Sequence, residues 1–164
     1  MEHTVDISIN TSAVIETIKS WLSVIGKRTD GTQDPPYSKV TLSSVELAVL
    51  KGMVESAART VATAISRFVR NFTISVTSID FKIVNTRWAY PEGDNFDAIL
   101  TNDISTFCAS SAAGEYFAMY YSDFAQKNYE VAQAKMESIM RLLYFKTPPQ
   151  NSAKSMADIS GTII

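Results

Sequence analysis

The chain has 164 residues, of which 46% are hydrophobic and 20% are charged, and its 15 Lys and Arg residues against 17 Asp and Glu residues give a net charge of −2. This length suits one domain with its own core, while the apolar content and near-neutral charge exclude an intrinsically disordered chain and argue against binding to a phosphate backbone. The single Cys, Cys108, excludes an intrachain disulfide, and no apolar run approaches the roughly 20 residues that a membrane-spanning helix needs.

The first ten residues alternate in hydrophobicity. Val5, Ile7 and Ile9 fall on one side of an extended chain, with polar residues between them. This period of two predicts a half-buried strand. Because a strand at a chain terminus needs a pairing partner, we expect residues 1–10 to form an arm that pairs with a neighbouring subunit.

The segment that follows has helical spacing over residues 11–25, and then a long stretch of turn-forming residues over 27–41. A second helix begins at a capping box formed by Ser43 and Glu46. From there apolar residues recur at alternating steps of three and four between Leu47 and Phe68, which places the helix over Ser43 to Arg70. We therefore expect one continuous helix of about 27 residues, or roughly 40 Å.

A β insertion follows this helix. From Phe72 the apolar residues alternate, and their parity changes at Thr77 and Ser78, which predicts a turn or a bulge between two short strands. Strong turn residues over 90–95 then end the insertion, which we place at about residues 72–90.

Helical spacing returns at Phe96 and continues to Cys108. The small residues of 109–114 then favour either close helix packing or a kink. A final helix is expected over about 115–146, where two prolines end it, and a polar tail with an apolar tip covers 150–164.

Together these segments predict a mainly α fold, a helical bundle with long helices, a small β-hairpin insertion and extended N- and C-terminal arms. The N-terminal arm covers residues 1–10, and the helical domain covers 11–149 with the β insertion at about 72–90. The C-terminal tail covers 150–164.

Catalytic chemistry is hard to build from these residue types. The only His is His3, in the N-terminal arm, so a Ser-His or Cys-His site and a zinc site both lack ligands or bases, and no glycine-rich phosphate loop is present. The densest acidic cluster, Glu92, Asp94 and Asp97, fits a solvated turn followed by favourable negative charge at a helix N-terminus. We therefore expect no catalytic residue, no metal, no cofactor and no enzymatic activity.

Three parts of the chain lack an internal explanation: the N-terminal strand, the β insertion and the C-terminal tail. Each leaves unpaired backbone or apolar surface in a monomer, so we expect contacts with neighbouring subunits, and head-to-tail contacts of this kind close into rings. The aromatic residues of the final helix wrap around more than one face, which favours core packing and subunit contact about equally. The candidate interface residues are Val5, Ile7, Ile9, Phe72, Ile74, Val76, Phe81, Ile83, Tyr116, Tyr120, Ile163 and Ile164.

The order of parts over residues 42–149 carries a resemblance to a known family. Its parts are the capped helix Ser43–Arg70, the β insertion Phe72–Tyr90, the segment Phe96–Cys108, and the run Tyr116–Tyr144 that closes with Leu142-Leu143-Tyr144-Phe145-Lys146-Thr147-Pro148-Pro149. This order resembles the helical connector or adaptor proteins of tailed bacteriophages, which form rings beneath the portal at the head–tail junction. That family has no invariant catalytic motif, so no functional residue is carried over.

The resemblance implies a non-enzymatic structural subunit of a phage virion, assembled in the host cytoplasm into a homo-oligomeric connector ring. Its partners would be copies of itself, the portal, and tail or other ring proteins, without a membrane or sequence-specific nucleic acid. The N-terminal strand and the Asp30–Lys39 loop depart from the family's pattern.

A second hypothesis comes from a different class of protein. A cytosolic helical bundle could bind a small apolar ligand or a protein partner. This hypothesis predicts an enclosed pocket among Trp21, Phe68, Phe107 and Phe124.

Overall fold

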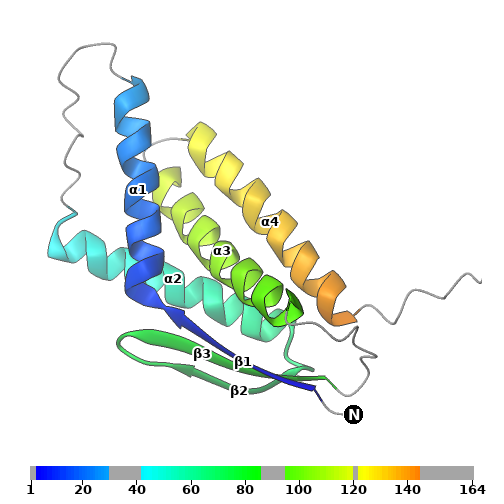
Figure 1. Cartoon of the computed structure of the whole chain (residues 1–164). Coiled ribbons are helices and arrows are strands. Elements are labelled where there is room, and N and C mark those ends of the chain that lie inside the picture. The colour runs from blue at the N-terminus through cyan, green and yellow to red at the C-terminus, as the bar shows by residue number, and fades with distance from the viewer. Residues whose placement is uncertain (1–2, 30–41, 86–94, 120–121, 145–164) are drawn as a thin grey trace, which may run out of the picture.

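The computed structural model describes residues 3–29, 42–85, 95–119 and 122–144. Four helices lie on one side of a small antiparallel sheet (Figure 1), so the mainly α fold with a β-hairpin insertion is confirmed. The predicted C-terminal tail lies outside the described residues. In chain order the elements are β1 (His3–Asn10), α1 (Thr11–Thr29), α2 (Ser44–Ala64), β2 (Val69–Ile74), β3 (Ser78–Asn85), α3 (Asn95–Ala118) and α4 (Ser122–Tyr144).

The N-terminal strand pairs within its own chain. The sheet has the order β1-β3-β2, and β1 runs antiparallel to β3 from His3 opposite Asn85 to Asn10 opposite Ser78. The prediction that residues 1–10 need a neighbouring subunit is therefore wrong. The reason is that the β2–β3 hairpin presents an open edge as long as β1 itself, which satisfies the backbone of β1 inside the chain.

One face of the sheet is apolar on all three strands. The opposite face carries polar pairs, including an ion pair between Asp6 and Lys82 at 3.9 Å and a hydrogen bond from Ser8 to Asp80. The apolar face lies against the helices, with α2 in contact with β2 and β3, and α1 and α3 in contact with β1. Its three cross-strand rows are Val5–Ile83–Val69, Ile7–Phe81–Phe72 and Ile9–Ile79–Ile74.

The hairpin turn is held by two helices. Ser75 N–H donates to the carbonyl of Ser78 at 2.8 Å, which confirms a turn at the predicted change of parity. The first backbone N–H of α1, on Thr11, donates to the Thr77 carbonyl at 3.0 Å, and Lys51 Nζ of α2 donates to the Val76 carbonyl at 2.9 Å. The turn is thereby fixed in place although its side chains are exposed.

Helix α2 begins as predicted and ends early. Ser43 and Glu46 form the capping box, since the N–H of Ser43 donates to Glu46 Oε2 at 2.8 Å and the N–H of Glu46 donates to Ser43 Oγ at 3.3 Å. The helix stops at Ala64, so the prediction of a helix reaching Arg70 is wrong. Beyond Ala64 the chain turns into β2, because the N–H of Phe68 donates to the carbonyl of Ile65 at 2.8 Å in a tight turn and the carbonyl of Phe68 accepts from Val84 of β3 at 2.8 Å.

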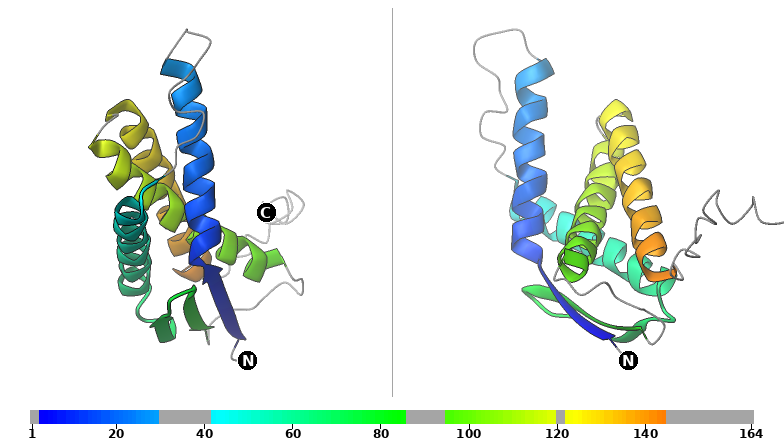
Figure 2. Two further views of the ribbon diagram at one scale, coloured as in Figure 1. Left: turned by 90° about the vertical axis from the view of Figure 1, so that its left-hand side faces the viewer. Right: turned by 45° about the vertical axis from the view of Figure 1, so that its right-hand side comes forward.

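Helices α3 and α4 form a close antiparallel pair, which Figure 2 shows side by side. α3 continues through residues 109–114, so close packing, not a kink, is the outcome there, and the expected helix start at Glu115 is wrong. Gly114 explains the close approach: a Cβ at this position would lie 2.7 Å from Cε1 of Tyr129 on α4. A side chain would therefore displace the Tyr129 ring.

We expect Gly114→Ala to destabilise the chain by about 1 kcal/mol or more, because the added methyl overpacks the contact with Tyr129. In a Tyr129→Ala background the same change should stabilise the chain by about 0.5–1 kcal/mol, because Ala favours a helix over Gly. Urea denaturation of the four proteins gives this coupling as a double-mutant cycle. Equal effects in the two backgrounds would contradict the contact.

Candidate functional site

Most of the predicted interface residues lie inside the chain's own core. Phe72 and Ile74 are half-buried on the same apolar sheet face. The expectation that these residues face a neighbour is wrong where they are buried, because the helices of the same chain cover the apolar rows of the sheet. The buried candidates, each at most 7% exposed, are Val5, Ile7, Ile9, Phe81, Ile83 and Tyr116.

Of the four remaining predicted interface residues, one is exposed and three lie outside the described residues. Val76, at the tip of the hairpin turn, is 81% exposed and stays available for contact. Tyr120, Ile163 and Ile164 lie outside the described residues, so their predicted role stays a prediction.

The strongest candidate surface was not predicted, and it lies on α2. One helix face, which we call the outer α2 face, is exposed and uncharged over about three turns, directly opposite the side that packs on α3. Val45 on this face is 70% exposed and Val49 is 45% exposed. The residues of the outer α2 face are Val45, Ala48, Val49, Gly52 and Ser56.

Gly52 is at the centre of the outer α2 face. A Cβ at this position would meet no atom within 4 Å, so packing within the described chain does not require a glycine. The sequence signal for this face is the spacing of four between Val45 and Val49, which falls off the predicted seam of Leu50 and Val54. A helix that is apolar on both sides is the pattern that reveals it.

The capping box at the start of α2 is also tied to α3. The backbone N–H of Ser43 and then its hydroxyl lower the pKa of Glu46 below its usual value, and a weaker contribution in the same direction comes from a hydrogen bond with Tyr116. The acid therefore stays ionised at neutral pH and keeps the capping box with Ser43 closed. The capping box fixes the first turn of α2, where the outer α2 face begins.

A buried ionic contact joins α3 to α4. The carboxylate of Asp103 has a side-chain exposure of 4%, and its two oxygens accept hydrogen bonds from Lys135 Nζ and Ser138 Oγ, each at 2.6 Å. Sequence reasoning missed this group because its partners lie more than thirty positions away. The local signal is an acid spaced by four from the buried Phe107. Both oxygens accept hydrogen bonds that join α3 to α4, which makes Asp103 a structural residue.

Cys108 is fully buried in the core, as its apolar neighbours in the sequence predicted. Burial raises the pKa of its thiol to about 12. The thiol is therefore protonated at neutral pH and has no access to solvent, which excludes it as a nucleophile.

The four aromatic residues of the apolar-pocket hypothesis do not meet. Phe68 makes an edge-to-face contact with Tyr144 at the end of α4, with ring centroids 4.8 Å apart. Phe124 lies at the start of α4, about 30 Å from that end, and packs against Phe117. A single enclosed pocket lined by both Phe68 and Phe124 is therefore wrong.

Comparisons with protein-family models, curated proteins and solved structures found no match to this chain. Among the described residues, no group of three or more His, Cys, Asp and Glu side chains is placed to hold a metal ion. No helix in that part of the chain combines the length and hydropathy required to cross a membrane.

We expect Lys135→Met to lower the free energy of unfolding by about 1–3 kcal/mol, because it leaves the buried carboxylate of Asp103 without its cation. Lys127→Met on the same helix is the control, since its ammonium only lies over the Phe124 ring, 5.9 Å from the centroid, and should cost about 0.5 kcal/mol or less. Chemical denaturation measures both. Equal costs would show that Asp103 does not depend on Lys135.

The Cys108 thiol predicts a loss of stability at high pH. Its pKa is about 12 in the folded chain against an ordinary value of 9.0, so between these values unfolding releases a proton. The free energy of unfolding should therefore fall as pH rises above about 9, by up to about 1.4 kcal/mol per pH unit more than in Cys108→Ala. Denaturation curves of the two proteins at increasing pH test this, and parallel pH profiles would contradict it.

Proposed function

We propose that this chain is a non-enzymatic structural subunit that assembles with copies of itself, and that the outer α2 face is the surface through which it does so. The observation that carries the proposal is the exposure of Val45 and Val49 on a face without a charged residue. Exposed helix faces in soluble proteins are normally charged or polar. An apolar exposed stripe of this kind supports the proposal that this face is a contact surface.

Gly52 supports a contact with another backbone. A glycine in the middle of an exposed helix costs about 1 kcal/mol relative to alanine, and the described chain gives no packing reason for it. A second helix or strand lying on the outer α2 face would approach most closely where the side chain is absent. The cost in helix stability is then offset by the area that the contact buries.

The hairpin tip supplies a second contact surface. Val76 is 81% exposed, and Lys51 and Thr11 hold the turn that carries it. Two different surfaces on one subunit permit head-to-tail contacts, in which the surface of one copy meets a different surface of the next, and such contacts close into rings.

We propose the connector ring of a tailed-phage virion as the specific assembly, with portal and tail or other ring proteins as neighbours. This part rests on the order of the capped helix, the β insertion and the two following helices, which resembles that family. The β insertion of this chain is largely used for its own core, so the proposal assigns assembly to the outer α2 face and Val76 and not to the strands.

The test compares two valines of equal exposure. Val49→Glu on the outer α2 face should weaken self-association at least tenfold, whereas Val131→Glu on α4 should leave it unchanged, because Val49 is 45% exposed and Val131 is 44% exposed. Size-exclusion chromatography with light scattering measures the oligomeric state, first of the chain alone and then with a purified phage portal protein added. A stable monomer under both conditions, or equal effects of the two variants, would overturn the proposal.

A further inference from the structure

A groove lies between α1 and α3, at the point where β1 passes into α1. Its volume is about 320 Å³, at the lower end of the range of about 300–1,000 Å³ that small-molecule sites occupy. Ala13, Thr17 and Trp21 line it from α1 at a spacing of four, and Asn102 and Ser105 line it from α3. It is separate from the outer α2 face and from the hairpin tip.

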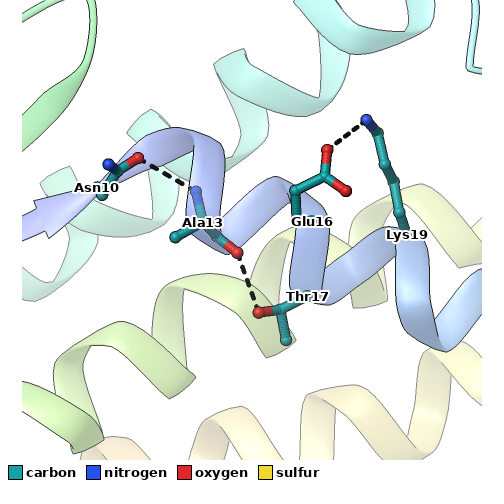
Figure 3. A network of polar contacts seen from close by, with 5 residues as sticks. All are labelled: Asn10, Ala13, Glu16, Thr17 and Lys19. Carbon is teal, nitrogen blue, oxygen red and sulfur yellow. Dashed lines mark hydrogen bonds and ion pairs between the residues drawn. The ribbon is translucent and has the colours of Figure 1, made fainter.

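Among the residues that the structure describes, no charged side chain lines the groove. The nearest charges on α1, Glu16 and Lys19, bind each other at 2.6 Å and extend from the other side of the helix, while Thr17 points toward α3 (Figure 3). An anionic or cationic ligand would therefore lose its hydration without gaining a counter-charge. The lining favours a neutral ligand.

The groove nevertheless offers both hydrogen-bond donors and acceptors. In the part of the chain that the structure describes, the side chains of Asn102, Ser105 and Thr106 make no hydrogen bond. Asn10 uses its Oδ1 to cap α1, accepting from the N–H of Ala13 at 3.2 Å (Figure 3), which leaves its amide hydrogens as donors. A ligand with several hydroxyl groups matches such a mixed set, because each hydroxyl both donates and accepts.

Trp21 adds a flat apolar surface to this polar lining. Its side chain is half-buried at the groove, and an indole combines a broad apolar face with one N–H donor. A sugar ring has the complementary form, with hydroxyls around its edge and C–H groups on its faces. We propose that the groove between α1 and α3 binds one neutral sugar ring, held against Trp21 and hydrogen-bonded by Asn102, Ser105 and Thr106.

The test adds a panel of neutral methyl glycosides, one at a time, to the full chain. Binding is measured by saturation-transfer NMR on the glycoside and by the change in the indole N–H signal of Trp21. We expect at least one glycoside to bind with a Kd of about 1 mM. Ala13→Leu, which fills the groove, should weaken that binding at least tenfold, and Ala134→Leu, at an exposed alanine of α4, should not change it.

Any one of four outcomes would overturn the proposal. The first is that no glycoside in the panel binds, and the second is that binding persists in an Ala13→Leu protein whose circular dichroism and melting temperature match the wild type. The third is that a phosphorylated sugar binds at least tenfold more tightly than its neutral counterpart, which would show recognition of charge. Asn102→Ala is a second variant that removes a hydrogen-bonding group without adding bulk, and unchanged affinity in both variants would also exclude the groove.

Discussion

Eight residues of β1 lie antiparallel against eight residues of β3, and the positions of the other elements follow from this register. Alone, β2 and β3 would form a two-stranded ribbon, which is marginal in water. β1 adds a third apolar side chain to each cross-strand row and completes the surface on which the helices pack. Because α1 follows β1 without a linker, the same register fixes where α1 begins and places its first N–H against the hairpin turn.

The features that the sequence predicted well depend on neighbouring residues. The capping box of Ser43 and Glu46 and the turn before Ser78 are built from side chains and backbone within four positions of each other. The end of α2 at Ala64 was not predictable in this way, because it depends on the turn that closes between Ile65 and Phe68 and on the hydrogen bond from Val84 of β3, far along the chain, to the Phe68 carbonyl. Local helical spacing continues past the residue where tertiary structure ends the helix.

The candidate sites likewise separate into features that local sequence predicts and features that depend on tertiary structure. The alternation of Val5, Ile7 and Ile9 correctly predicted a surface that must be covered, but it could not tell a neighbouring subunit from the chain's own helices. The outer α2 face was visible in principle, since Val45 and Val49 lie four apart. The groove was not, because its two walls come from segments some ninety positions apart, and only the fold brings Trp21 near Asn102.

The pairing of the first strand with β3 also sets an order of events during synthesis. Val5 is paired with Ile83, so the apolar side of β1 stays uncovered until the ribosome has delivered just over half of the chain. Contacts between residues so distant in sequence are slow to form and leave apolar strand surface open to aggregation in the meantime. Polar residues alternate with the apolar ones along β1, Asp6 and Ser8 among them, so one side of the strand is hydrophilic before it pairs. The same residues form the solvent-exposed face of the folded sheet.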